Sequence, residues 1–136
     1  MLTPMQMLIA AAVVVHAVAA VFWMSSSGMV ARGGGLAAEK LFPRQMGAVL
    51  VAVLTGGFLW SQLHTGGFGA YEMVLAGGAL LAILAAVIQG VGVGTSLGKL
   101  KTGNEAAARK TMAGANGAAA GLLGLCFVCM IVARFI

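Results

Sequence analysis

Four long apolar stretches divide the sequence, and each is close to the ~20 residues that a helix needs to cross the ~30 Å hydrocarbon core of a bilayer. Short segments that carry most of the charged residues separate them. Hydrophobic residues make up 61% of the chain and charged residues only 8%, whereas about a quarter of the residues in a soluble domain are charged. The sequence therefore predicts an all-α integral membrane protein, a bundle of four transmembrane helices that forms one domain over residues 1–136.

The helices are expected over about residues 7–30, 46–63, 73–97 and 107–136. Asn104 before Glu105 is typical of a helix N-cap, so the fourth helix should begin inside the loop that precedes it. Pro43 is expected in the first turn of the second helix, where a proline is tolerated. We interpret the first stretch as a helix and not as a signal peptide, because no basic residue precedes Arg32 and the apolar run is too long.

The charges predict an orientation in the membrane. Seven of the eight basic residues lie near the loops after the first and third helices, namely Arg32, Lys40, Arg44, Lys99, Lys101, Arg109 and Lys110. Only Arg134 lies on the other side. Cytoplasmic loops are enriched in Lys and Arg, so we expect a multi-pass protein of the bacterial inner membrane with both termini and residues 62–72 on the periplasmic side. No aromatic residues are interleaved with these bases, so the charge favours contact with the bilayer and no nucleic-acid partner.

Twenty-one glycines are many for a helical chain, because glycine weakens isolated helices. In lipid, however, small residues let helix backbones approach closely. Gly117, Gly121 and Gly124 recur on one face of the fourth expected helix. We therefore expect that face to pack tightly, and a second face of small residues would allow the protein to form homo-oligomers.

His16 stands alone in the apolar run "VVVHAVAAVFW". It lies about ten residues from the periplasmic end of its helix, which is ~15 Å of depth. An ionisable residue at that depth indicates a functional site, so His16 is a candidate ligand or proton carrier. The alternative is a neutral ring hydrogen-bonded to a backbone carbonyl, Ser or Thr of a neighbouring helix. His64 ends the second helix near the surface, where an exposed histidine is ordinary, and is a weaker candidate ligand.

Cysteine and methionine allow a second kind of site. Cys126 and Cys129 have C-x-x-C spacing inside an expected helix, where they could pack as small apolar residues or ligate a soft metal. Met5 and Met7 lie at the periplasmic end of the first helix. Because thioethers, thiolates and imidazole suit Cu(I), these four residues with His16 form the alternative copper site.

Two segments resemble known membrane proteins. The segment "HAVAAVFWMSSSGMVAR" has Trp23 seven residues after His16 and Arg32 at its end. It resembles the first helix of the HemJ-type protoporphyrinogen oxidases and of the membrane domain of the copper-resistance protein CopD. The segment "LTGGFLW", with Thr55 and Gly56, is similar to their second helix, where a Thr-Gly pair recurs. The resemblance covers the first two helices, and beyond them only the number and length of the helices agree.

The resemblance implies haem b bound by His16, the position associated with haem in HemJ-type proteins. Those proteins also have a lysine in a later helix that is associated with activity, and residues 73–97 contain none, so oxidation of porphyrinogens is not implied here. Met130, a cysteine or His64 are candidates for the second axial ligand. The predicted function is haem b binding with an electron-transfer or redox role, with quinone as a redox partner.

Two other functions remain open at this stage. The chain could be a non-catalytic subunit of a larger membrane complex or a homo-oligomeric scaffold, or it could handle or transport copper. A relay of buried carboxylates is excluded, because the three acidic residues, Glu39, Glu72 and Glu105, all lie near helix ends.

Overall fold

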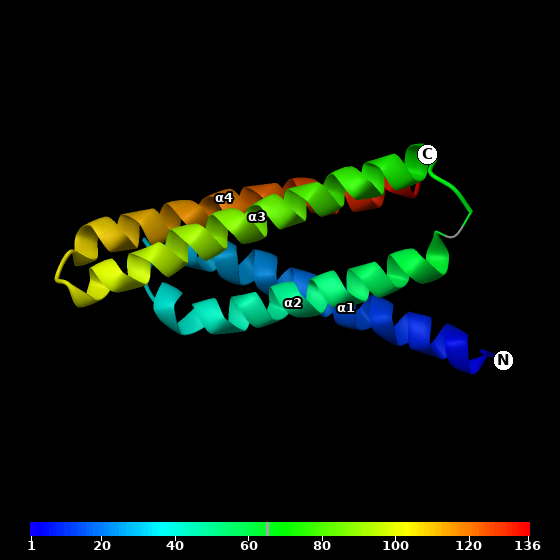
Figure 1. Ribbon diagram of the computed structural model, residues 1–136, viewed down its shortest axis with the longest axis horizontal. Coiled ribbons are helices and arrows are strands. Elements are labelled where there is room, and N and C mark those ends of the chain that lie inside the picture. Colours follow the sequence, from blue (N-terminus) through cyan, green and yellow to red (C-terminus); the bar gives the residue numbers. More distant parts are fainter. Residues whose placement is uncertain (65) are drawn as a thin grey trace.

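The computed structural model describes residues 1–64 and 66–136, and the described chain is built from helices (Figure 1). They are α1 (Pro4–Arg32), α2 (Ala38–Leu63), α3 (Ala70–Lys101) and α4 (Glu105–Ala133). Each of the four is long and apolar enough to cross a membrane. The prediction of an all-α chain with four helices long and apolar enough to span a membrane is confirmed.

The helix ends follow local chemistry. Thr3 caps α1, because its hydroxyl accepts from the Gln6 N–H while the Gln6 side chain accepts from the Thr3 N–H, and Pro4 occupies the first helical position. The α4 helix begins after Asn104 as expected, but the Asn104 side chain makes no capping hydrogen bond. It ends at Ala133, so the expected extension to residue 136 is absent.

The position predicted for Pro43 was wrong. The α2 helix begins at Ala38, well before the expected start, and Pro43 lies inside it. A proline in that position cannot donate to the carbonyl of Glu39, four residues earlier. The sequence places Glu39, Lys40 and Arg44 in this region, and the charges led us to expect a loop. The structure shows that α2 carries these charges on a helical extension.

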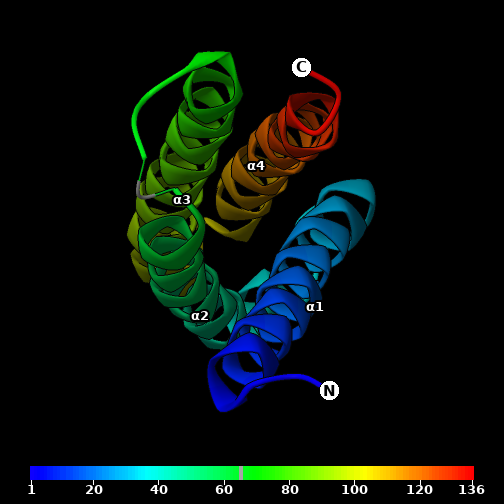
Figure 2. The ribbon, with the colours of Figure 1, turned by 90° about the vertical axis from the view of Figure 1, so that its right-hand side faces the viewer.

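The helices form two pairs. The α3 and α4 helices lie side by side along their length, and α1 packs with α2 (Figures 1 and 2). The α4 helix also packs against α1, whereas α2 makes little contact with α3. The pairs lie close together at one end of the bundle and diverge toward the other (Figure 1).

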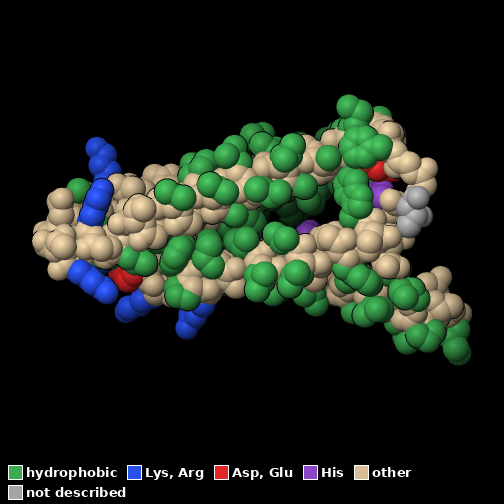
Figure 3. Space-filling view, in the orientation of Figure 1, with side chains coloured by type: hydrophobic (Ala, Val, Ile, Leu, Met, Phe, Trp, Pro, Cys, Tyr) green, Lys and Arg blue, Asp and Glu red, His purple; other side chains and the backbone are tan. Residues whose placement is uncertain are grey.

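We name the two ends of the bundle by their composition. The basic end holds the α1–α2 and α3–α4 connections, where Lys and Arg side chains gather (Figure 3). The terminal end holds both chain termini and the connection between α2 and α3 (Figure 1). Figure 3 also shows that the face between the two pairs is hollowed toward the terminal end. Both termini lie at the same end of the bundle (Figure 1).

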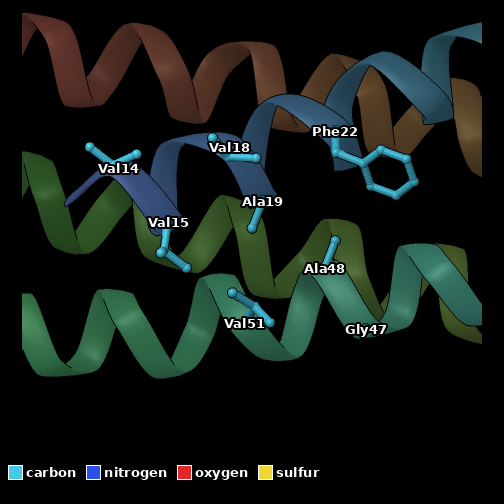
Figure 4. Close-up of a pocket in the computed structure, with 8 residues that line it drawn as sticks. All are labelled: Val14, Val15, Val18, Ala19, Phe22, Gly47, Ala48 and Val51. Atoms are coloured by element: carbon cyan, nitrogen blue, oxygen red, sulfur yellow. The ribbon is translucent and has the colours of Figure 1, made fainter. Parts of the chain in front are cut away.

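The buried core fills the middle and the basic half of the bundle. One cluster of buried apolar residues contains Val30, Ala38, Val93, Met112 and Ala115, and a second contains Trp23, Ala85, Ala119 and Leu123. Many large apolar side chains on the outer helix faces are exposed, as expected for helices surrounded by lipid. An apolar groove of about 370 Å³ lies between Val18 and Phe22 of α1 and Ala48 and Val51 of α2 (Figure 4).

Alanines supply most of the buried face of α4, and of the three predicted glycines the half-buried Gly117 lies against α1, where an added Cβ would be 3.5 Å from the Ala31 Cβ. Ala115 and Ala119 are buried, whereas Gly121 is exposed. A Cβ atom at Gly92 of α3 would lie only 2.5 Å from the Cβ of Ala115. The buried residues of α4 recur every three or four positions from Ala108, and Gly121 falls outside this stripe. Close approach therefore depends on a glycine of α3 facing an alanine of α4.

An ion pair joins α2 to α4 at the basic end. The Arg109 guanidinium donates to both carboxylate oxygens of Glu39, and to the Gly35 carbonyl at 2.9 Å. Gly35 has φ +86°, and a Cβ there would lie 2.3 Å from the Arg109 carbonyl oxygen. The α1–α2 connection therefore lies directly on the first turns of α4.

Candidate functional site

The His16 side chain is held by α2. Its Nδ1 lies 2.9 Å from the carbonyl oxygen of Ala52 and 3.0 Å from Oγ1 of Thr55. The Thr55 hydroxyl donates to the Val51 carbonyl at 2.7 Å, so its oxygen can accept from the ring. Because a carbonyl oxygen only accepts, Nδ1 carries the hydrogen, and in the neutral ring Nε2 then carries the lone pair. Within the described residues, the hydrogen bonds of the ring involve Nδ1 alone.

Small residues allow α2 to approach the ring this closely. A Cβ at Gly56 would lie 3.1 Å from Cε1 of His16, which is tighter than most contacts of real Cβ atoms. Ala52 is buried and Thr55 is half-buried. The two segments that carry the resemblance to the HemJ and CopD groups therefore meet in space, since His16 of one contacts Thr55 and Gly56 of the other.

This geometry includes the interhelical hydrogen bond that was expected if His16 is a structural residue and not a ligand. The half-buried ring donates to a backbone carbonyl of the neighbouring helix. The same arrangement also suits a ligand, because metal-binding histidines usually donate their second ring N–H to a carbonyl or carboxylate. One nitrogen fixes the orientation and the tautomer, and the other retains its lone pair. The hydrogen bonds at Nδ1 are therefore compatible with a ligand at Nε2.

The other candidate ligands have different neighbours. Nδ1 of His64 lies 3.3 Å from Glu72 at the terminal end, about two and a half helical turns beyond Thr55 along α2. Cys126 and Cys129 pack against Gly78 of α3. Within residues 1–64 and 66–136, no three His, Cys, Asp or Glu side chains group as metal ligands.

The methionine candidates are also dispersed. Met5 and Met7 are exposed on the first turns of α1, and Met130 is half-buried on α4. The copper set therefore consists of side chains on separate helix faces in this structure, with His16 held against α2 and the cysteines against α3.

A network of buried polar side chains was missed by our sequence analysis. Gln45, Gln89 and Asn116 are fully buried, one on each of α2, α3 and α4. The Gln89 amide donates to Asn116 Oδ1 at 2.9 Å and to Ser27 Oγ at 3.1 Å, and its oxygen accepts from Trp23 Nε1 at 2.6 Å. The network therefore links all four helices through uncharged groups.

Gln45 completes this network from α2. Its amide nitrogen lies 3.1 Å from Ser26 Oγ, 3.2 Å from Asn116 Oδ1 and 3.5 Å from Ser27 Oγ. Its own Oε1 is buried without a hydrogen-bond partner among the described residues. The Asn116 amide is anchored in turn, since it donates to the Met112 carbonyl at 2.8 Å.

The network is suited to holding helices in register and not to acid–base chemistry, because its amides, hydroxyls and indole do not titrate in the ordinary range. Trp23 connects it to the His16 region, since these residues lie seven positions apart on α1, or ~10 Å along the helix. A signal was available in the sequence: Gln45, Gln89 and Asn116 are polar residues that fall in or beside apolar stretches, where polar groups are costly unless paired.

Comparison of the chain with protein-family profiles, with curated proteins and with solved structures found no match. The resemblance to the HemJ and CopD groups therefore stays a prediction from the sequence.

Proposed function

We propose that this protein binds haem b within the bilayer, with Nε2 of His16 as the axial ligand, and that it transfers electrons. One observation carries the proposal: Nδ1 of His16 donates to Ala52 and Thr55, which leaves a lone pair on Nε2 inside a membrane-spanning segment. Haem supplies a reversible one-electron change at iron when it is bound. Met130 stays the candidate for a second ligand, because His64 lies nine residues beyond Thr55 along α2, about 13 Å, which is too far to share an iron with His16.

Thr55 and Ala52 have a defined part in this proposal. A histidine N–H that donates to an oxygen makes the ring a stronger electron donor through its other nitrogen. The two oxygens also prevent rotation of the ring, which fixes the direction of the Nε2 lone pair. Thr55 is therefore a positioning residue for His16.

The orientation supports a site in the periplasmic half of the bacterial inner membrane. The basic end carries seven of the eight Lys and Arg residues, and such ends face the cytoplasm. His16 lies on the half of α1 that is nearer the terminal end. Electrons would accordingly enter or leave near the periplasmic surface, where lipid-soluble quinones are a suitable partner.

Matched variants test the proposal. The purified protein in detergent is titrated with hemin, and binding is followed by the shift and sharpening of the Soret band. We expect stoichiometric binding, its loss in His16→Ala, and its retention in the control Thr95→Val, because Thr95 is exposed and bonds only within α3. Thr55→Val should still bind haem, but the midpoint potential of the haem iron should be higher because the ring becomes a weaker electron donor. Equal Soret bands in the native protein and His16→Ala would overturn the proposal.

A structural role is the second candidate. The network of Gln45, Gln89 and Asn116 joins four helices without any charged group, and the His16 hydrogen bond joins α1 to α2 in the same manner. These features favour a rigid scaffold that acts as a subunit of a larger membrane complex or as a homo-oligomer. Native mass spectrometry of a gentle extract distinguishes this role, since a monomer that carries haem and no protein partner contradicts it.

Copper handling receives less support from the structure. The sulfur ligands proposed for Cu(I) are dispersed, with Cys126 and Cys129 together against Gly78 of α3 and Met5 exposed near the start of α1. Metal analysis of the purified protein tests copper handling, and copper bound in proportion to protein would support that function.

A further inference from the structure

At the terminal end, a histidine and a carboxylate face each other across the junction of α2 and α3. His64 is the last residue of the α2 region, and its Nδ1 lies 3.3 Å from Oε1 of Glu72. Oε2 of Glu72 accepts from the Gly69 N–H at 3.0 Å, at the start of α3. The His64 side chain is only 9% exposed and the Glu72 side chain 19%. The Glu72 carboxylate is thus held by both His64 and the Gly69 N–H, and both side chains are largely shielded from solvent.

Aromatic rings surround this pair. The Tyr71 ring stacks on the His64 ring with centroids 4.9 Å apart, and the Trp60 ring lies 5.1 Å away at a tilt. Phe68 lies 6.4 Å from Trp60. Figure 3 shows histidine and acidic side chains at the terminal end. The exposed Phe68 ring places an apolar surface beside the pair, which a flat apolar molecule in the bilayer can contact.

The arrangement is that of an oriented proton acceptor. When Nδ1–H of His64 donates to the Glu72 carboxylate, Nε2 carries a lone pair that can accept from a hydroxyl group. The carboxylate also stabilises the imidazolium that forms if the proton is transferred. Within the described residues, the hydrogen bonds of the His64 ring involve Nδ1 alone. A ligand for these groups needs a flat ring and a hydroxyl donor.

We propose that His64, Glu72, Trp60 and Tyr71 bind the head group of a lipid-soluble quinol, whose hydroxyl donates to Nε2 of His64. The physiological meaning of this site rests on the proposed electron transfer, because the quinol would be the electron donor. Binding itself requires no haem. The quinol tail would extend from the terminal end into the hydrocarbon region between the helix pairs.

The probe is heptyl-hydroxyquinoline N-oxide, a redox-stable flat hydroxyaromatic with an alkyl tail whose fluorescence reports binding. The full chain in detergent should change the probe fluorescence saturably, and a decyl-substituted benzoquinol should reverse the change by competition. We expect the dissociation constant to rise at least tenfold in His64→Leu and also in Glu72→Gln, which keeps the shape of the side chain. Thr95→Val should bind as the native protein does.

Two results would contradict the proposal of a quinol site. One is a fluorescence change that grows linearly with probe, as in protein-free micelles. The other is an unchanged dissociation constant in both His64→Leu and Glu72→Gln when circular dichroism shows native helix content. The two proposals can be tested separately. Saturable probe binding without a Soret band contradicts only the proposal of haem binding. A His16-dependent Soret band without saturable probe binding contradicts only the proposal of a quinol site.

Discussion

The buried polar network predicts that two identical substitutions at equally buried positions have different costs. Gln89 and Gln45 are both fully buried, and methionine replaces either with little change in length or volume. Gln89 takes part in three hydrogen bonds of 2.6 to 3.1 Å. Gln45 makes contacts of 3.1 to 3.5 Å through its nitrogen, and its oxygen has no partner among the described residues.

The magnitude follows from these bonds. Hydrogen bonds between membrane helices contribute about 0.6 kcal/mol each, so three of them give about 2 kcal/mol for Gln89→Met. That substitution also leaves the Trp23 N–H unpaired, which costs about 1 kcal/mol more. Gln45→Met loses about 1 kcal/mol of bonds and removes a buried acceptor that itself costs about 1 kcal/mol, so its net effect is about zero.

The assay is reversible unfolding by sodium dodecyl sulfate in mixed micelles, followed by far-ultraviolet circular dichroism. We expect Gln89→Met to lower the free energy of unfolding by about 2 to 3 kcal/mol more than Gln45→Met does. A cycle with Trp23→Phe should show positive coupling to Gln89→Met, because the two residues share a hydrogen bond. The reasoning is refuted if Gln45→Met is as destabilising as Gln89→Met.

Two further predictions concern the basic end. Gly35→Ala should destabilise the bundle far more than the control Gly34→Ala in the same unfolding assay: both have positive φ, but only a Cβ at Gly35 meets the Arg109 backbone, and Gly34 faces open space. Comparable losses would contradict this close approach. Glu39→Gln should lower the thermal midpoint more than Glu105→Gln, because Arg109 donates twice to Glu39 and lies 3.6 Å from the more exposed Glu105. The reverse order would contradict the assignment of Glu39 as the main partner.

The number and nature of the helices could be predicted because the bilayer imposes a length and a composition that are visible in the sequence. Their ends were less predictable. The charged residues near Pro43 resemble a loop, yet α2 carries them on a helical extension that is fastened by the ion pair from Arg109. That pair joins residues seventy positions apart, and no local pattern indicates it.

The contacts of His16 were predictable in kind but not in detail. Burial in an apolar helix implied a partner on a neighbouring helix, and the sequence could not give its identity because helix rotation decides which residues meet. The same limit applies to the α4 packing face, where Ala115 and not Gly121 is buried. It also applies to His64 and Glu72, whose contact depends on how the start of α3 is placed relative to the end of α2.

The most direct test of the central claim is the absorption spectrum of the full chain purified from a membrane that makes haem b, with haem content measured as the pyridine complex. The account predicts one haem b per chain, with a Soret band and dithionite-induced α and β bands that disappear in His16→Ala. A colourless protein that takes up no added hemin would contradict it.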